Sequence, residues 1–236
     1  MHCHILPGVD DGAKDWETAK QILQMEYDQG VRGIIFTPHY REHYFETNAR
    51  ELVAQYTKML EVVKEMGLNM RLHLGCECHS HENMGEHLRG RFCLTMAQSP
   101  YVLTEFSSAH SYQKIRNQIY ELINQGYRPI IAHIERYPCI LENPDKIQEL
   151  LDLGAEIQVN ADSVLGMDGR AVKKFCKKLM KADQIDYIGS DVHDTKNRAS
   201  HIGKCAKYVE RKMGTDYAVR IFYENPLNII RKRVGE

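Results

Sequence analysis

The amino-acid sequence predicts an α/β protein whose strands form a parallel sheet, either open and doubly wound or closed into a barrel. Short β-rich runs alternate with amphipathic helical patterns along the whole chain, as they do in repeated βα units. Hydrophobic residues make up 43% of the 236 residues, and a single α/β barrel fills that length. The sequence contains no evident linker, low-complexity tract or domain boundary, so we expect one domain.

The predicted strands are six runs rich in branched aliphatic and aromatic residues. Most of them read as continuous apolar stretches, which is typical of strands buried on both faces of a parallel sheet. The runs cover residues 31–39, 70–77, 101–106, 127–135, 155–161 and 186–193.

The segments between these runs place apolar residues at helical spacing. A helix is predicted over residues 15–30, where Gly30 ends the run. A second helix is predicted over residues 46–66, and its expected apolar face consists of Leu52, Val53, Tyr56, Leu60 and Val63. Further helices fit residues 111–125, 145–153, 168–182 and 199–213.

The balance of charges excludes several classes of function. The chain has 31 Lys and Arg residues against 32 Asp and Glu residues, a formal net charge of -1, so it lacks the basic excess of a nucleic-acid-binding protein. No apolar run is long enough for membrane insertion, and the start lacks the apolar core of a signal peptide. We therefore expect a cytoplasmic protein with no nucleic-acid partner.

The seven cysteines form an odd, scattered set, which predicts mostly free thiols in a reducing compartment. The "CEC" stretch at 76–78 has no matching second pair, so we expect no structural zinc site there. The cysteines are Cys3, Cys76, Cys78, Cys93, Cys139, Cys176 and Cys205.

Polar residues that bind metals follow almost every predicted strand. The chain opens with "MHCHILPGVDDG", and two histidines one residue apart on an extended segment point both imidazoles to the same side. In a barrel, the carboxyl ends of the strands converge on one site, so these side chains should meet. The candidate ligands are His2, His4, Asp11, His39, Glu77, Glu105, His133, Asp191 and His193.

Imidazoles and carboxylates together suit manganese, zinc or iron, and the ligand types do not choose between these metals. Nine candidate ligands exceed the needs of one ion, so the sequence predicts two or three divalent metal ions bridged by a carboxylate. Such clusters activate water and clamp a phosphoryl oxygen, which is the chemistry of phosphate-ester hydrolysis.

Two arginines lie close in sequence to these candidate ligands. Arg136 follows His133 in "AHIERY", and Arg198 follows His193 in "SDVHDTKNR". A guanidinium group offers a bidentate fork to the non-bridging oxygens of a phosphate. The alternative for either arginine is a surface salt bridge, for example with a neighbouring acidic residue such as Glu135 or Asp194.

The motifs in their order, "HCH…GVDDG…TPH…GCE…TEF…AHIERY…QVN…GSDVH…R", resemble the PHP (polymerase and histidinol phosphatase) domain. The match is to the bacterial CpsB/CapC-type metal-dependent protein-tyrosine phosphatases, which act on tyrosine kinases that regulate capsule and exopolysaccharide synthesis. The resemblance covers essentially the whole chain. It implies that residues 1–236 form a single PHP metallophosphatase domain with a distorted seven-stranded β/α, TIM-like barrel.

The resemblance also implies a three-metal site that is often manganese-dependent, with iron or zinc as alternatives. The first ion would be held by His2, His4 and Asp191. Glu77 would bridge it to a second ion bound by Glu105 and His133. The third ion would be held by Asp11, His39 and His193. Asp11, rather than its neighbour Asp10, matches the family position. Arg136 and Arg198 match the family's phosphate-binding arginines, and Asp11 or His193 would serve as a general acid where not committed to metal.

Two departures from the family pattern affect these expectations. The family usually begins with a short strand before its histidine pair, whereas Met1 directly precedes His2 here. The first strand is thus largely missing from this chain, which leaves six readable strands and a stub at residues 2–5. We therefore expect His2 and His4 to be weakly anchored. Ile134 and Val192 stand where the family more often has proline and alanine, and we expect small packing changes there.

Two alternatives to a tyrosine phosphatase remain open. A small-molecule phosphomonoesterase such as histidinol-phosphate phosphatase would need a closed, acidic pocket for an amine, whereas a protein substrate needs an open mouth. A degenerate, non-catalytic barrel would bind phosphotyrosine or a kinase without turnover. A 5′-exonuclease is disfavoured by the lack of basic excess. Tyr40 and Phe45 either flank the substrate ring or pack under a loop.

Overall fold

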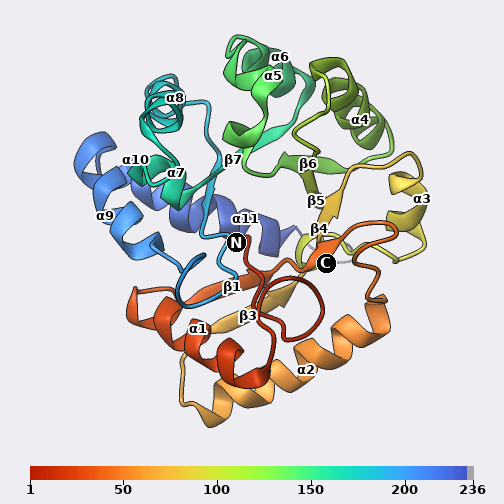
Figure 1. The fold of residues 1–236 in the computed structure, drawn as a ribbon, viewed down its shortest axis with the longest axis vertical. Helices are drawn as coiled ribbons and strands as arrows, with labels where there is room; N and C mark the ends of the chain where they lie inside the picture. The colour runs from red at the N-terminus through yellow and green to blue at the C-terminus, as the bar shows by residue number, and fades with distance from the viewer. Residues whose placement is uncertain (233–236) are drawn as a thin grey trace.

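The structure is a computed structural model that describes residues 1–232, and it shows a curled parallel sheet surrounded by helices (Figure 1). The longer of its two sheets has the order β2-β4-β5-β6-β7-β8, and β1 pairs with β3 in the other. Every pairing between these strands is parallel. The bounds are β1 (Gly33–Phe36), β2 (His39–Tyr40), β3 (Arg71–Leu74), β4 (Glu77–His79), β5 (Tyr101–Glu105), β6 (Arg128–Ile131), β7 (Glu156–Asn160) and β8 (Tyr187–Gly189).

The two sheets are successive parts of one wall. Phe36 pairs with Leu74 in the smaller sheet and His39 pairs with Glu77 in the larger, so the register is the same on both sides of the break. The break falls at Pro38, which has no N–H to donate to a ladder. The predicted run 31–39 therefore covers β1 and the start of β2, the run 70–77 covers β3 and the start of β4, and each of the other four runs contains one strand.

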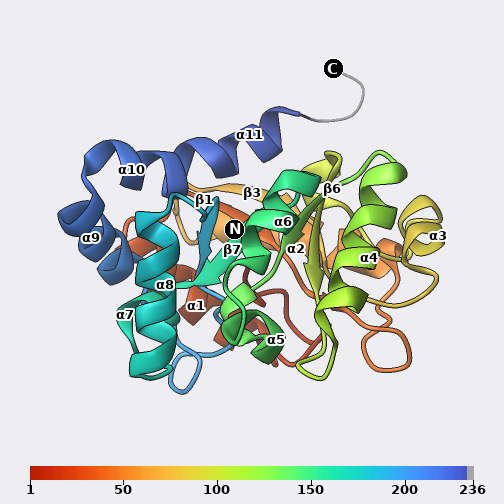
Figure 2. The same ribbon diagram turned by 90° about the horizontal axis from the view of Figure 1, so that it is seen from above.

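Helices cover the outside of this wall (Figure 2). Three of the longer helices begin with a polar side chain that accepts a backbone N–H of the first turn: Asp15, Asn48 and Ser111. The bounds are α1 (Trp16–Asp28), α2 (Ala49–Glu65), α3 (Met84–Arg89), α4 (Tyr112–Asn124), α5 (Pro138–Leu141), α6 (Lys146–Leu153), α7 (Ala161–Leu165), α8 (Arg170–Lys181), α9 (Ile202–Met213), α10 (Thr215–Val219) and α11 (Asn225–Arg231). A 3₁₀ turn at Ile134–Arg136 follows β6, and a π-helical turn at Arg220–Glu224 precedes α11.

The helices agree with the prediction to within a few residues, but the expected face of α2 is partly wrong. Its buried residues are Leu52, Met59, Val62 and Val63. Val53 and Leu60 are 50% and 43% exposed. Both lie about a quarter turn around the helix from Leu52, which turns them towards solvent. The short helices α3, α5 and α7 and the C-terminal α10 and α11 were not predicted.

The N-terminal stub is held firmly, contrary to expectation. Cys3 forms an isolated parallel bridge with Val192, and the His4 N–H donates to the Val192 carbonyl at 2.9 Å. On the other side, the Thr37 N–H donates to the Cys3 carbonyl at 3.0 Å. The stub therefore fills the seventh wall position between β8 and β1, although it is too short to form a regular strand. His2 and His4 are both fully buried, so weak anchoring was wrong.

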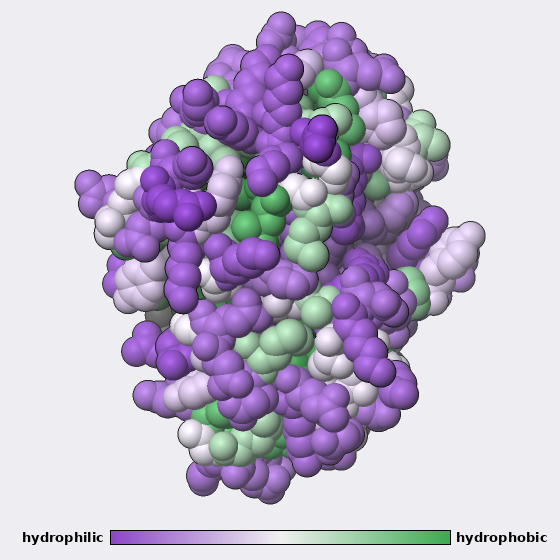
Figure 3. Space-filling view, turned by 60° about the vertical axis from the view of Figure 1, so that its left-hand side comes forward, coloured by the Kyte–Doolittle hydropathy of each residue, from purple (hydrophilic) through white to green (hydrophobic). Residues whose placement is uncertain are grey.

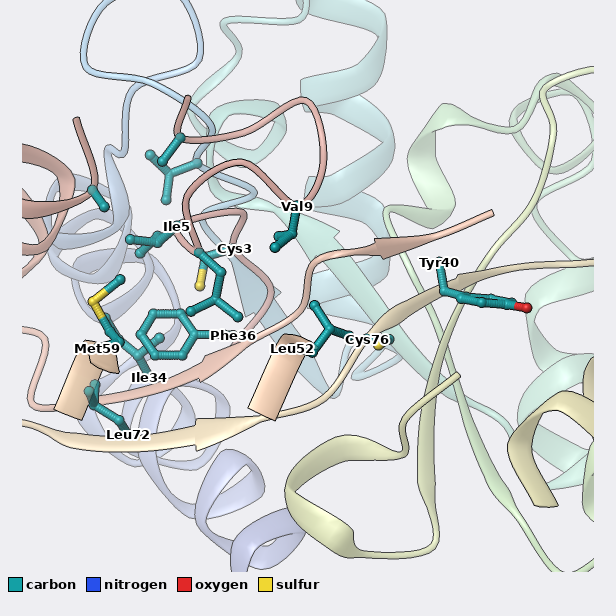
Figure 4. Packing of buried hydrophobic residues seen from close by; sticks show 14 of the residues in the cluster. Cys3, Ile5, Val9, Ile34, Phe36, Tyr40, Leu52, Met59, Leu72 and Cys76 are labelled. Carbon is teal, nitrogen blue, oxygen red and sulfur yellow. The ribbon is translucent and has the colours of Figure 1, made fainter. Parts of the chain in front are cut away.

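The hydrophobic core lies between the wall and its helices and continues inside the barrel. Figure 4 shows Cys3, Ile34 and Phe36 grouped together, with Met59 of α2 and Leu72 of β3 beside them. A separate cluster at the amino-terminal ends of the strands includes Ile229 of α11. Because α11 covers that end of the barrel, the polar carboxyl ends of the strands face the opposite side (Figure 2).

The cysteines mostly follow the prediction. Five are free thiols, and four of these are buried. Cys78 and Cys93 are joined by a disulfide, with their Cα atoms 6.4 Å apart, so the expectation of free thiols fails for this pair. The sequence could not predict it, because the loop after α3 brings Cys93 back onto β4.

The outer surface over α8, α9 and α10 is mostly hydrophilic and carries small, separated hydrophobic areas (Figure 3). Within residues 1–232, no helix is both long enough and apolar enough to cross a membrane.

Candidate metal centre

The structure brings all nine predicted ligand side chains together at the carboxyl ends of the strands. His39 and Glu77 begin the short strands β2 and β4, and Glu105 ends β5. His133 follows β6. The remaining five come from the stub, the loop after it and the segment after β8, and are His2, His4, Asp11, Asp191 and His193. Convergence from six wall positions is the arrangement expected of a barrel mouth.

Glu77 lies at the centre of the cluster and is fully buried. Its Oε1 is 2.9 Å from His133 Nε2 and 3.2 Å from His2 Nε2. Its Oε2 is 3.1 Å from His39 Nδ1 and 3.2 Å from His4 Nε2. Burial alone would raise the pKa of Glu77, but the surrounding imidazoles hold it well below the usual range. A carboxylate with imidazoles on both oxygens has the geometry of a bridging ligand.

Asp191 forms a second focus. Its Oδ1 is 3.4 Å from both His2 Nε2 and His4 Nε2. Its Oδ2 forms an ion pair with Arg136 Nη1 at 2.9 Å and accepts a hydrogen bond from Asn160 Nδ2 at 2.8 Å. The carboxylate thus faces the imidazoles with one oxygen and is oriented by donors through the other.

Asp11 stands at the outer rim with its side chain 46% exposed. Its Oδ1 is 3.5 Å from His39 Nε2 and 3.4 Å from His193 Nε2. The neighbouring His193 imidazole is the main reason that the pKa of Asp11 is far below its usual value. This third group of donors is the one most accessible to solvent.

The donor atoms fit divalent metal ions, because several of them are buried with their lone pairs unused. Within residues 1–232, His2 Nε2, His4 Nε2, His193 Nε2 and Glu77 Oε2 are buried and have no hydrogen-bond partner. Burial and the nearby charge of Glu77 also raise the pKa of Glu105 to about 8. Both observations indicate missing positive charge, which divalent cations would supply.

Four overlapping groups have ligand atoms within 4.8 Å of one another. They are His4, Asp11, His39 and His193; His2, His4 and Glu77; His2, His133 and Asp191; and His39, Glu77 and Glu105. The three ligands predicted for the third ion lie together, and His4 joins them. The ligands predicted for the first and second ions are divided differently. His133 lies with Asp191, whereas Glu105 lies with His39.

Each of three inward imidazoles has its other nitrogen occupied by a hydrogen-bond partner. His2 Nδ1 lies 3.1 Å from Gln158 Oε1, which accepts its hydrogen bond. The same Oε1 atom also accepts a hydrogen bond from the backbone N–H of His133 at 2.7 Å, which identifies it as the amide oxygen. The His193 Nδ1 atom lies 2.8 Å from the Asp191 carbonyl oxygen, and His4 Nδ1 lies 2.7 Å from Asp10. These bonds keep the proton on Nδ1 and leave the Nε2 lone pair for a metal.

These supporting residues were not predicted from the sequence. Gln158 and Asn160 lie on β7, and Asn160 donates to Asp191. Asp10 accepts from the Gly12 and His39 N–H groups as well as from His4, so the Asp10–Asp11 doublet divides into a supporting and a facing residue. The available signal was the "QVN" stretch, because polar residues two apart in a buried strand point to the same side.

Both arginines reach the rim of the cluster. Arg136 forms an ion pair with Asp191. In Arg198, Nη1 lies 3.3 Å from Asp11 Oδ2 and Nη2 lies 3.5 Å from Asp191 Oδ1. Their side chains are 44% and 40% exposed, so each guanidinium group contacts both the cluster and solvent. The alternative of a pair with Glu135 or Asp194 is wrong for the described residues. Glu135 is buried and accepts the Asn160 N–H, and Asp194 accepts backbone N–H groups of its own loop.

The two aromatic residues after His39 have different surroundings. Phe45 stacks on His39, with ring centroids 5.5 Å apart and an interplanar angle of 14°. Tyr40 is buried, and its hydroxyl lies 2.7 Å from His87 Nδ1. Phe45 therefore borders the cluster, whereas Tyr40 packs beneath a loop.

A family model described as "Capsular polysaccharide synthesis, CpsB/CapC" matches residues 1–231. The chain belongs to the CpsB/CapC family. It is 31% identical to the tyrosine-protein phosphatase CpsB of Streptococcus pneumoniae over 98% of this chain and 97% of that protein. It is 33% identical to the tyrosine-protein phosphatase YwqE of Bacillus subtilis over 92% of this chain and 85% of that protein.

Solved structures agree with this membership. A structure from a study of YwqE from Bacillus subtilis and CpsB from Streptococcus pneumoniae, described as metal-dependent tyrosine phosphatases, matches with a TM-score of 0.91. The two chains are 28% identical over 99% of this chain and 94% of the other. The histidinol phosphate phosphatase of Lactococcus lactis matches with a TM-score of 0.60 at 14% identity, over 90% of this chain and 92% of the other. That likeness shows the fold alone, and the predicted PHP-type barrel is confirmed.

Proposed function

We propose that this CpsB/CapC chain is a metal-dependent protein-tyrosine phosphatase whose substrate is a bacterial tyrosine kinase regulating capsular or exopolysaccharide synthesis. The observation that carries the proposal is the convergence of nine metal-type ligands and two half-exposed guanidinium groups on one mouth. The names of the two relatives and their identity over most of this chain support the same reaction. We further propose that residues 1–236 act as a single PHP-type domain.

The cofactors in this proposal are two or three divalent metal ions, with manganese expected first and iron or zinc as alternatives. The ligand assignment keeps Asp11, His39 and His193 as one set around the rim. Glu77 is the bridging carboxylate, because imidazoles surround both of its oxygens. When bound, such ions lower the pKa of water and neutralise charge on a phosphoryl group.

Arg136 and Arg198 bind the non-bridging oxygens of the phosphate. Asp191 contacts both guanidinium groups, which keeps them at the rim of the cluster before substrate binds. Each guanidinium has five N–H donors, so donors remain for a phosphate. Charge-assisted hydrogen bonds from these groups stabilise the charge that develops on the phosphoryl oxygens.

The leaving group of a phosphotyrosine is a phenolate with a pKa of about 10, which leaves more readily than a serine alkoxide. The demand on a general acid is correspondingly small, and Asp11 or His193 would supply the proton where it is not committed to a metal. Phe45 borders the cluster and flanks the aromatic ring of the substrate. The exposed fractions of Asp11 and both arginines describe an open mouth, which suits a protein side chain better than a free amino alcohol.

The test compares a phosphotyrosine peptide with histidinol phosphate, with and without manganese, and counts bound metals by elemental analysis. We expect metal-dependent turnover of the peptide. Arg136→Ala should lower kcat/KM about 10- to 100-fold, because it removes charge-assisted hydrogen bonds. His133→Ala should lower both the metal content and the turnover.

Arg220→Ala is the matched control, because Arg220 pairs with Asp183 away from the mouth, and it should leave turnover unchanged. A preference for histidinol phosphate would move the protein to the small-molecule alternative. Phosphopeptide binding without turnover in the metal-loaded protein would indicate the non-catalytic barrel. The proposed cytoplasmic location is supported by the five free thiols and is tested by cell fractionation.

A further inference from the structure

Helix α8 carries a stripe of positive charge that the metal centre does not use. Its sequence, RAVKKFCKKLMK, contains one arginine, five lysines and no acidic residue, in a chain whose formal net charge is -1. The opposite face of the helix is buried, through Phe175, Cys176, Leu179 and Met180. The basic stripe consists of the five exposed residues Arg170, Lys174, Lys177, Lys178 and Lys181.

These charges lie on one side of the helix and repel one another. Residues three and four apart are neighbours on a helix surface, so Lys174 adjoins both Arg170 and Lys178, and like charges at that spacing destabilise the helix. Arg170 in the first turn also opposes the helix dipole. Lys178 and Lys181 in the last turn favour the helix dipole, but this does not account for the charges at Arg170, Lys174 and Lys177, which points to a role outside the fold.

The stripe has little compensation from nearby acidic groups. Among residues 1–232, Lys178 is the one stripe residue with a carboxylate within 4 Å, at 3.7 Å from the fully exposed Asp145. Lys173, the sixth cation of α8, is used internally, because its Nζ donates to the Leu165 carbonyl at 2.8 Å. The other four stripe residues therefore present charge to solvent that no carboxylate within 4 Å compensates in the described part of the chain.

The stripe begins beside the mouth. Helix α8 packs against the turn Ile134–Arg136, which carries one of the two rim arginines. Figure 2 shows α8 running along the outer wall, with its first residues at the end of the barrel where α7 and the loop after β8 lie. Positive charge is therefore present on both sides of this contact, at Arg136 in the rim turn and along the exposed face of α8.

We propose that the basic stripe binds an acidic segment of the substrate protein, next to the phosphotyrosine that enters the mouth. The proposal rests on the phosphatase function above and adds the chemistry of the sequence around the target tyrosine. From Arg170 to Lys181 the helix rises about 17 Å at about 1.5 Å per residue. An extended peptide covers that length with about five residues. A short run of Asp and Glu therefore matches the stripe in both length and charge.

An acidic peptide fits better than an anionic membrane surface. The stripe lies on the side wall and runs along the barrel, so a flat bilayer against it would not face the mouth, whereas a peptide can turn from the wall into it (Figure 2). The surrounding surface is mostly hydrophilic with small, separated hydrophobic areas, so it offers little for insertion between lipids (Figure 3).

The experiment measures peptide binding to the manganese-loaded protein by fluorescence anisotropy, which does not depend on turnover. Two phosphotyrosine peptides differ in having either four acidic or four neutral residues beside the phosphotyrosine. We expect the wild type to bind the acidic peptide about tenfold more tightly at low salt, with the difference shrinking as salt is raised. The variant Lys174→Glu/Lys177→Glu/Lys178→Glu should lose this preference and keep its affinity for the neutral peptide.

The control variant, Lys64→Glu/Arg71→Glu/Arg231→Glu, makes the same change in net charge at exposed positions outside α8 and should retain the preference. Equal affinity of the wild type for both peptides would overturn the proposal. So would equal weakening in the two triple variants, or binding to phosphatidylglycerol vesicles without a peptide preference. Turnover of p-nitrophenyl phosphate, measured in parallel, reports on the phosphatase function separately and should be unchanged in both variants.

Discussion

Three of the candidate ligand residues have backbone conformations that side-chain-bearing residues seldom adopt. The φ angles of His2, His133 and Asp191 are 67°, 31° and 51°. Such angles in non-glycine residues store local strain and persist where the surroundings hold them in place. Here the surroundings are hydrogen bonds from β7, since Gln158 holds His133 through its N–H and Asn160 holds the Asp191 carboxylate.

Gln158 should therefore control metal affinity without touching the metals. Gln158→Leu removes the acceptor of His2 Nδ1 and of the His133 backbone N–H, so the His2 imidazole loses its fixed orientation and the strained His133 backbone loses a restraint. We expect manganese affinity, measured by calorimetric titration, to fall about 10- to 100-fold. Gln158→Glu keeps an acceptor oxygen and should recover most of the affinity.

The exposed Gln148→Leu on α6 is the control and should bind manganese as the wild type does. Unchanged manganese affinity in folded Gln158→Leu would show that the imidazoles are oriented by other contacts.

The loop between the stub and α1 is the element that delivers the aspartate doublet. It is closed by hydrogen bonds from Gly8 N–H to the Ala13 carbonyl and from Ala13 N–H to the His4 carbonyl. At Gly12 the chain passes so close to His4 that an added Cβ would lie 2.1 Å from the His4 carbonyl oxygen. Glycine is required there by a close approach of backbone to backbone.

Gly12→Ala should displace this loop or His4, because no flexible side chain is available to give way. We expect kcat/KM for a phosphotyrosine substrate to fall at least about tenfold and the metal content to drop. Gly33→Ala in β1 is the matched control, since its Cβ would meet the Arg71 carbonyl oxygen at an ordinary 3.9 Å. Wild-type activity in Gly12→Ala would mean that the loop does not position Asp10 and Asp11 for the reaction.

At the scale of the whole molecule, the barrel concentrates ionisable groups in its mouth. Glu77 and Asp191 are almost completely buried, and four imidazoles with little exposure lie around them. Burying carboxylate and imidazole side chains costs free energy of folding unless opposite charge balances them. Since the ligands come from both ends of the chain, ions bound here would tie the N-terminal stub to the segment after β8.

Metal binding should therefore stabilise the entire fold. At a free manganese concentration of 100 times Kd, linkage predicts about 2.7 kcal/mol of stabilisation. For a domain of this size that corresponds to a rise in Tm of about 5–10 °C, measured by scanning fluorimetry in manganese against a chelator. Glu77→Gln should show a smaller rise. An identical Tm under both conditions would argue against a metal site made of these residues.

The sequence by itself determined the class of fold and the composition of the mouth. Alternating βα patterns predict parallel strands, and parallel strands bring their carboxyl ends together whatever the details of packing. For that reason residues as distant as His39, Glu105 and His133 could be placed in one site from their positions at strand ends. Their roles as ligands, and those of Arg136 and Arg198, remain predictions for the experiments above.

The tertiary structure decided everything that depends on which distant segments pack together. The stub is held by Thr37 on one side and Val192 on the other, which local pattern did not reveal. The partner of Cys78 and the role of Gln158 are likewise set by neighbours far away in sequence. A helix over residues 168–182 was predicted, but its packing against the turn Ile134–Arg136 was not. Periodicity reports which face of an element is buried, whereas the identity of the neighbours is settled only when the chain closes into the barrel.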